Sequence, residues 1–491
     1  MDLSLEQQYA FDRFKRGENI FVTGQGGTGK TRLIEQFVEH SIHNKTVFQV
    51  CALTGCATIL LPEMCKARTI HSWSGIKLCK GDNQRIVSNA LKNRSVKASW
   101  KKVHVLIVDE VSMMSVKILE VLDAIARKAR FMNYLPFGGI QVVFVGDFYQ
   151  LPPVGTIGDP DTERFCFESD LWAQLFPKNN HIELKTVFRQ TDSQFKEILS
   201  QVRTATLTDA NIKILEGYVK REYNPDEYNG CVPPKLYPIR AKADYLNNLR
   251  YSKLEGNEYT YEHKRCGFNS EEEDKEAKTS DSKTITKEIC LSREEYEYEC
   301  DQLMNTSSFQ EVLELKVGAV VMCTVNLDMD NGICNGSQGI ITSIDKTGVL
   351  NYPVVKFTNG VEQTITPHFI KSDEYPTISV GQIPLCLAWA MTIHKIQGAT
   401  LAMASIDVGG QIFEYGQTYV ALSRVQSLDG LYLSAFNAYK IRANERVIEF
   451  YAGLPELEYK IDSDPFQKYA YKEEELREEE YVEPNIKRVH L

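Results

Sequence analysis

Lys30 and Thr31 end a glycine-rich stretch, residues 24–31, that reads GQGGTGKT. Its G-x-x-x-x-G-K-[ST] spacing lets backbone N–H groups wrap a polyphosphate without Cβ clashes, and it aims a helix N-terminus and a lysine at the anion. Apolar residues at 20–22 precede the stretch and others at helical spacing follow it, so we predict strand, loop and helix in that order. This setting predicts a nucleoside triphosphate site, with Lys30 on the phosphates and the Thr31 hydroxyl on Mg²⁺. The expected loop residues are Gly24, Gln25, Gly26, Gly27, Thr28, Gly29, Lys30 and Thr31.

Two adjacent carboxylates, Asp109 and Glu110, follow the apolar run at 103–108. Carboxylates at the C-terminal end of a buried strand are typical of the second motif of an ATPase. We expect Asp109 to hold Mg²⁺ and Glu110 to orient and deprotonate the attacking water. Apolar residues at helical spacing between 118 and 129 predict a helix after this pair.

Three other residues have side chains suited to the same chemistry. Gln7 lies near the start of a predicted helix, where its amide could bind an adenine edge, although a solvent-facing helix glutamine is the alternative. Gln150 follows the apolar run at 140–145 and is expected to sense the γ-phosphate. Arg189 lies at an expected domain junction, where its guanidinium would supply charge to the transition state.

Small hydroxyls, a histidine and a tryptophan follow the next predicted strand, residues 47–53. Thr54, His71 and Trp73 are the candidates, because such side chains can grip a phosphodiester backbone and stack a base. The same residues also fit ordinary loop chemistry, with Trp73 anchored in the core.

Length and composition indicate a globular protein. The 491 residues allow about three domains, and the 43% of hydrophobic residues can build sizeable cores. No run of about 18 apolar residues occurs, and the first residues lack the basic start and apolar stretch of a signal peptide. We therefore expect an intracellular, soluble protein that is not secreted and does not bind membranes. The 12 cysteines contain no C-x-x-C pair, which favours buried free thiols and predicts no structural zinc.

The net charge of −10 gives no overall support for nucleic-acid binding. However, residues 271–300 carry 11 acidic and 5 basic side chains, and residues 471–491 carry 7 and 4. These two segments hold nine of the ten net negative charges, so the rest of the chain is nearly neutral and leaves room for a local basic groove.

Composition also divides the chain. Residues 77–101 are polar and basic and predict a small insertion whose cationic face could meet phosphates, although a solvated charged face is the simpler interpretation. Residues 269–300 predict a charged surface insertion, and the tail at 455–491 is acidic and expected to be loosely held. Turn signals separate short strands near 330–375 and predict a small β-barrel.

The order of these motifs resembles superfamily 1B DNA helicases, in particular the petite-integration-frequency (PIF) family, which is related to RecD-type enzymes. The resemblance spans roughly residues 3–451 and is weakest across 205–310. It is carried by EQ at 6–7, GQGGTGKT at 24–31, DEVSM at 109–113, GDFYQLPPV at 146–154, VFRQ at 187–190, TIHKIQGAT at 392–400 and YVALSR at 419–424.

The family implies an α/β fold with two RecA-like P-loop domains, here 1–185 and 186–454, whose parallel sheets clamp ATP between them. By the same resemblance, 77–101 is a wedge insertion in the first domain and 330–375 an SH3-like β-barrel in the second. The expected catalytic residues are Lys30, Asp109, Glu110, Gln150, Arg189 and Arg424, with Gln7 on adenine and with Thr31 and Asp109 on the metal. The expected DNA contacts are Thr54, His71, Trp73, His394 and Gln397.

The resemblance implies an ATP-dependent and Mg²⁺-dependent DNA helicase. It is expected to move 5′→3′ along single-stranded DNA and to unwind forked duplexes in replication, repair or recombination. We expect a monomer that meets replication or repair proteins in the nucleus or at a cytoplasmic, including viral, replication site. A P-loop ATPase that remodels RNA or protein complexes is the alternative, and only the DNA-contact motifs argue against it.

Overall fold

The computed structural model of this chain describes residues 3–190, 192–224, 232–267, 292–307, 309–328, 331–346, 351–372, 375 and 377–455. The predictions for the acidic tail, and for most of the charged insertion at 269–300, lie outside these residues. Within the described ranges, no helix is both long and apolar enough to cross a bilayer.

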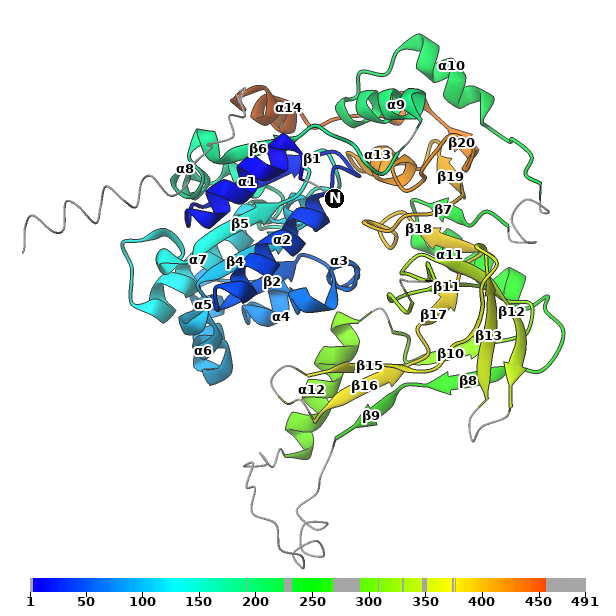
Figure 1. Cartoon of the computed structure of the whole chain (residues 1–491), viewed down its shortest axis with the longest axis horizontal. Coiled ribbons are helices and arrows are strands. Elements are labelled where there is room, and N and C mark those ends of the chain that lie inside the picture. Colours follow the sequence, from blue (N-terminus) through cyan, green and yellow to red (C-terminus); the bar gives the residue numbers. More distant parts are fainter. Residues whose placement is uncertain are drawn as a thin grey trace, which may run out of the picture.

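A six-stranded parallel sheet forms the first unit, drawn in blue and cyan in Figure 1. In the order β3-β2-β4-β5-β1-β6, its strands are β1 (Ile20–Gly24), β2 (Phe48–Ala52), β3 (Arg68–Thr69), β4 (Val105–Asp109), β5 (Gln141–Val145) and β6 (His181–Leu184). Its helices are α1 (Leu5–Lys15), α2 (Lys30–His43), α3 (Gly55–Leu60), α4 (Ile70–Trp73), α5 (Asn83–Lys92), α6 (Arg94–Lys102), α7 (Val116–Arg130) and α8 (Asp170–Leu175). The strand, loop and helix predicted around the glycine loop are confirmed, as is the helix after Glu110.

Both faces of this sheet are buried. Phe21 and Phe144 pack in one core with α7, whereas Val22 and Val143, their neighbours along the same strands, pack in another core with α2. Successive side chains of a strand point to opposite faces, so a sheet covered on both faces needs nearly continuous apolar strands. This explains why the strands read as uninterrupted apolar runs.

The basic stretch at 77–101 folds mostly into α5 and α6, which pack against α7. Trp100 of α6 is completely buried, and its ring centroid lies 4.5 Å from that of Trp73 on α4. The cationic residues therefore lie on helices anchored in the first core.

A four-stranded parallel sheet forms the second unit, on the right of Figure 1. In the order β18-β7-β19-β20, its strands are β7 (Lys235–Tyr237), β18 (Ala390–Thr392), β19 (Ala404–Val408) and β20 (Leu431–Phe436). Its helices are α9 (Ser193–Thr204), α10 (Asp209–Gly217), α11 (Arg240–Tyr251) and α13 (Gln417–Leu422). The two parallel sheets confirm the predicted α/β fold class.

Antiparallel strands are inserted into this second unit. The largest antiparallel sheet has the order β14-β13-β12-β11-β17, from β11 (Val320–Cys323), β12 (Gln338–Asp345), β13 (Tyr352–Phe357), β14 (Glu362–Thr364) and β17 (Leu385–Leu387). The sheet thus extends beyond the predicted range of 330–375 on both sides. Beside it are the pair β8 (Tyr259–Glu262) and β10 (Val312–Leu315), the sheet of β9 (Lys264–Cys266), β15 (His368–Lys371) and β16 (Ser379–Gln382), and helix α12 (Arg293–Thr306).

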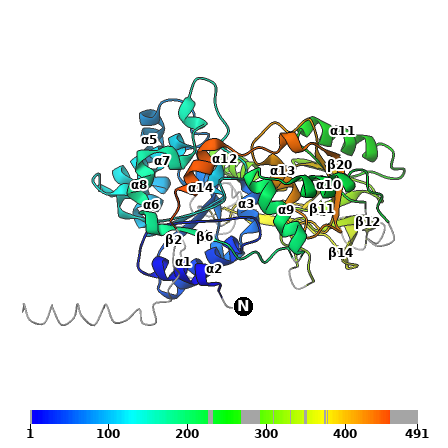
Figure 2. The same ribbon diagram turned by 90° about the horizontal axis from the view of Figure 1, so that it is seen from above.

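The final helix, α14 (Glu445–Ala452), follows β20 of the second unit but packs on the first (Figures 1 and 2). Its Val447 belongs to the core of the first unit, and the Phe450 ring centroid lies 4.3 Å from that of Phe167. The chain therefore crosses between the units twice.

Both crossings meet at Asp147, a carboxylate with no solvent exposure just after β5. Arg203 of α9 donates to both of its oxygens at 2.9–3.1 Å, and the Tyr451 hydroxyl of α14 donates to it at 3.2 Å. The Arg203 guanidinium also lies 4.6 Å from the ring centroid of Tyr149 and 5.0 Å from that of Tyr451. One buried charge thus joins three segments that are distant in sequence.

The cysteines whose side chains the structure describes are free thiols, and they are buried as predicted except for the exposed Cys266 and the half-buried Cys334. Cys51 in β2 and Cys323 in β11 are buried, and burial raises the pKa of Cys323 to about 12. Such thiols remain protonated at neutral pH and serve as small core residues.

Replacing Arg203 with glutamine should lower the free energy of unfolding by about 3–5 kcal/mol, because it leaves the buried Asp147 charge unpaired. Urea denaturation followed by circular dichroism measures this change. Arg240→Gln is the matched control, because it breaks an Arg–Asp pair whose arginine side chain is 86% exposed. Exposed pairs contribute little, so equal losses in the two variants would contradict a structural role for the buried pair.

Candidate nucleotide and nucleic-acid site

The glycine loop is closely surrounded by other backbone and side-chain atoms. Gly27 and Gly29 have φ angles of 87° and 80°, in the left-handed region that favours glycine. A Cβ on Gly27 would lie 2.5 Å from the Cβ of Arg189, and one on Gly29 would lie 2.6 Å from Nε2 of Gln7. Both glycines are therefore required for conformation and for space.

Lys30 begins α2 and folds back over the loop. Its Nζ donates to the carbonyl oxygens of Gly24 at 2.7 Å and Gln25 at 3.0 Å. Burial lowers the pKa of Lys30, while the carboxylates of Asp147, Glu110 and Asp109 act to raise it. Lys30 therefore lies close to these three carboxylates. Thr31, in the first turn of α2, is exposed.

The two predicted carboxylates lie at the end of β4, as expected. Asp109 is 9% exposed, and its Oδ1 accepts from the backbone N–H of Glu110 at 2.8 Å. Burial, reinforced by the Glu110 carboxylate, raises the pKa of Asp109 to about 7, and a bound cation would favour its ionised form. Glu110 has a φ of 55°, which is strained for a residue other than glycine and sets the direction of its side chain.

Two arginines of the second unit, Arg189 and Arg424, lie near Glu110. Arg189 donates to the carbonyl oxygens of Ser423 at 3.5 Å and Gly398 at 3.4 Å. Arg424 is 2% exposed and hydrogen-bonds inside the second unit, for example to Val420 O at 2.8 Å. Burial, and then the nearby Arg189 cation, lower the pKa of Arg424 to about 9. The two predicted arginines are therefore close neighbours, and Glu110 also acts on both.

Gln7 and Gln150 are both buried. Gln7 is 3% exposed, and its amide accepts from Ser4 N at 3.0 Å and donates to the loop carbonyls of Thr28 and Gly29 at 3.3 and 3.4 Å. It is not the solvent-facing glutamine of the alternative interpretation, and its contact with adenine stays a prediction. Gln150 is 5% exposed and lies against the turn that begins α13, where a Cβ on Gly416 would come within 2.6 Å of its carbonyl oxygen.

The prediction that Trp73 stacks on a DNA base was wrong. Its side chain is 3% exposed and packs against Trp100, so it cannot stack on a base in this structure. The alternative of a core anchor holds. Thr54 and His71 remain partly exposed, although the Thr54 hydroxyl also accepts from Ala57 N at 3.2 Å as the cap of α3.

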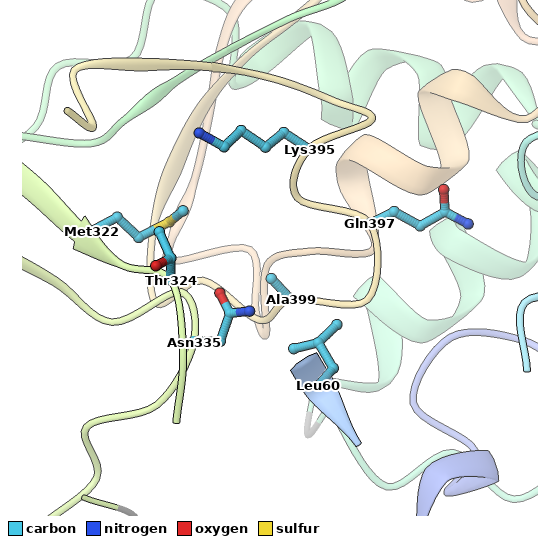
Figure 3. Close-up of a pocket in the computed structure, with 7 residues that line it drawn as sticks. All are labelled: Leu60, Met322, Thr324, Asn335, Lys395, Gln397 and Ala399. Carbon is cyan, nitrogen blue, oxygen red and sulfur yellow. The ribbon is translucent and has the colours of Figure 1, made fainter. Parts of the chain in front are cut away.

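A pocket lies between the two units, where α3 approaches the loop after β18. It is a small, partly open pocket lined by Leu60, Met322, Thr324, Asn335, Lys395, Gln397 and Ala399 (Figure 3). Gln397, a predicted DNA contact, is one of these residues. His394, the other prediction from this loop, is exposed and stacks on Phe413, with ring centroids 6.2 Å apart.

Two residues of the quoted motifs were given no role from the sequence but lie directly on the loop. The Tyr419 hydroxyl accepts from the Gly26 backbone N–H at 2.7 Å. Gln190 is 1% exposed, and among the described residues neither of its amide atoms has a hydrogen-bond partner. Its Oε1 lies 3.0 Å from where a Cβ on Gly27 would be. The only sequence signal for either residue was that it belongs to the same motif as a predicted catalytic arginine, VFRQ for Gln190 and YVALSR for Tyr419.

Comparisons with known proteins agree with this geometry. The PIF1-like helicase family matches residues 2–223, and the family DNA helicase Pif1, 2B domain, matches residues 303–344. The ATP-dependent DNA helicase RRM3 of Saccharomyces cerevisiae is 30% identical over 507 residues, which cover 93% of this chain and 68% of that protein. This chain belongs to the PIF1-like helicase family. The predicted resemblance is confirmed.

Other relatives extend the comparison. The ATP-dependent DNA helicase PIF1 of Xenopus laevis is 32% identical over 454 residues, and the chain spans 64% of its length. The crystal structure of Pif1 helicase from Candida albicans superposes with a TM-score of 0.70 at 32% identity, covering 93% of this chain and 100% of that one. A Pif1 helicase from Bacteroides in complex with ADP-AlF3 and ssDNA gives a TM-score of 0.60 at 26% identity, covering 92% and 97%.

Trp73→Ala should lower the free energy of unfolding by about 3–5 kcal/mol, because it leaves a cavity beside Trp100. Chemical denaturation measures the loss, and Tyr439→Ala, at a ring that is 93% exposed, is the control with little expected change. A variant of unchanged stability that binds single-stranded DNA much more weakly would restore the base-stacking role.

Proposed function

We propose that this PIF1-like protein is an ATP-dependent DNA helicase that moves 5′→3′ along single-stranded DNA and opens forked duplexes. One observation carries the proposal: Arg189 and Arg424 of the second unit lie near Glu110 of the first, and Arg189 also packs against Gly27 of the glycine loop. Hydrolysis at such an interface is coupled to the relative position of the units. The relatives named as ATP-dependent DNA helicases support this assignment.

The chain's own residues fit a polyphosphate. Lys30 and Arg189 are half-buried and Arg424 is buried, and this burial lowers the pKa of each of the three cations. Gln190 adds a buried amide that no other described residue satisfies. Buried groups of this kind are costly unless a ligand compensates them, and a triphosphate supplies the negative charge and the acceptor oxygens.

Thr31 and Asp109 together fit Mg²⁺. Thr31 and Asp109 offer hydroxyl and carboxylate oxygens, the hard ligands that this cation prefers, and it would neutralise phosphate charge there. The complex of the Bacteroides relative with ADP-AlF3 supports nucleotide use at this site.

The proposed catalytic roles follow from the contacts. When a nucleotide binds, the Lys30 ammonium gives up its hydrogen bonds to the carbonyl oxygens of Gly24 and Gln25 and donates to phosphate oxygens instead. Glu110 takes the proton of the attacking water, and Arg189 and Arg424 stabilise the charge that develops on the transferred group. We propose that Gln150, whose carbonyl oxygen lies against Gly416 at the start of α13, senses the γ-phosphate and relays its presence or absence to the second unit.

The proposed path of the single strand runs past Thr54, His71, His394 and Gln397, beside the pocket of Figure 3. The ssDNA complex of the Bacteroides relative supports this choice of ligand. We infer a monomer that works with replication or repair proteins, in the nucleus or at a cytoplasmic, including viral, replication site.

The test is steady-state ATP hydrolysis with and without a single-stranded oligonucleotide, followed by unwinding of forks that carry only a 5′ or only a 3′ tail. We expect strong stimulation by DNA and opening of the 5′-tailed fork. Opening of the 3′-tailed fork alone would overturn the polarity. Turnover that is indifferent to DNA would instead favour an ATPase that remodels RNA or protein complexes.

Lys30→Ala should reduce ATP turnover by about 10²–10³-fold, the usual effect of removing one donor to transition-state charge. Binding of single-stranded DNA, measured by fluorescence anisotropy, should be largely retained because Lys30 lies in the nucleotide loop. Lys128→Ala, at an exposed position on α7, is the control. Full turnover in Lys30→Ala would remove the glycine loop from the reaction.

A further inference from the structure

One hydrogen bond links the proposed catalytic base to the interdomain pocket. Nε2 of Gln397 donates to Oε2 of Glu110 at 3.2 Å, and the two residues are 287 positions apart in the chain. Gln397 is 7% exposed, so little water competes for this bond. The bond crosses from the loop after β18 to the end of β4, which means that it joins the second unit to the first.

The same loop forms part of the pocket wall. Figure 3 shows Lys395 and Gln397 extending from it in opposite directions, and both residues line the pocket together with Leu60 of α3. Lys395 is an exposed cation suited to a phosphate. A phosphodiester drawn to Lys395 therefore acts on a segment that also carries the amide bonded to Glu110.

The bond has a direct consequence for Glu110. A carboxylate that serves as a base must present a lone pair to the attacking water. The bond from Gln397 to Oε2 leaves other lone pairs of the carboxylate free, but it holds the whole carboxylate toward the second unit. The strained backbone of Glu110, with its φ of 55°, narrows the directions that the side chain can take.

We propose that Gln397 is a positioning residue that restrains Glu110 until nucleic acid binds the exposed Lys395 on the same loop. A phosphodiester that binds Lys395 shifts the loop that also carries Gln397, the bond from Gln397 to Glu110 breaks, and the released carboxylate turns to the attacking water. ATP turnover then depends on the DNA strand through this one side chain. The inference rests on the proposed helicase function and deepens it by naming the contact that couples the two sites.

The test measures ATP hydrolysis by the full chain at saturating Mg-ATP, with and without saturating oligothymidylate. Gln397→Ala should raise the DNA-free kcat about fivefold, the rate equivalent of one net hydrogen bond, with the KM for ATP unchanged. The rate with DNA should stay near that of the wild type, so the stimulation ratio should fall by the same factor. A general loss of structure would lower both rates and could not produce this pattern.

Two further variants complete the design. Gln397→Asn keeps an amide but is one methylene too short to reach Glu110, so it should reproduce the higher DNA-free rate even where alanine folds poorly. Gln36→Ala is the matched control, because it removes a similar Gln–Glu hydrogen bond of 2.7 Å from the outer face of α2. It should leave both rates unchanged.

The outcomes separate the two proposals. A wild-type rate indifferent to DNA would overturn the helicase function itself. Clear stimulation of the wild type, with a DNA-free rate in both Gln397 variants that is unchanged or lower, would overturn the restraint alone. In the latter case Gln397 would align Glu110 for catalysis or serve DNA binding only.

Discussion

The ion pair of Asp147 and Arg203 constrains how the two parallel sheets can be placed. A fully buried carboxylate must keep its partner, because separating the pair would leave a charge without solvent or counter-ion. Arg203 arrives from α9, just after the chain leaves the first unit, and Tyr451 arrives from α14, after the chain has completed the second. The Tyr451 hydroxyl also lies 2.5 Å from the Thr23 hydroxyl, one residue before the glycine loop. The contacts that join the units therefore end next to the proposed nucleotide site.

This arrangement explains the crowding of cations around the loop. Lys30 belongs to the first unit and Arg189 and Arg424 to the second, so the three come together only when the units are in contact. Their lowered pKa values reflect desolvation and, for Arg424, the repulsion from Arg189. Binding of a polyanion would favour the closed arrangement, and its departure would weaken it, which is the physical basis for coupling chemistry to movement.

Local patterns were predicted well because their physical causes are local. The glycine loop needs left-handed backbone angles and space within a few residues, and the apolar strands need burial on both faces. Both requirements are written in consecutive residues, so strand, loop and helix could be placed around Lys30, and Asp109 and Glu110 could be placed at a strand end. Exposure is different, since it depends on what packs against a side chain. Trp73 looked available for stacking, but Trp100, 27 positions later, covers its ring.

The sequence by itself determined the fold class, the glycine loop and the acidic pair, and through the order of its motifs it determined the family. Only the tertiary structure showed that Tyr419 sits on the loop, that Gln190 lacks a partner among the described residues, and that Gln397 holds Glu110. The reason is the length of chain between the partners. No periodicity or spacing encodes a hydrogen bond between residues hundreds of positions apart, because such a bond exists only after two separately folded sheets have been brought into contact.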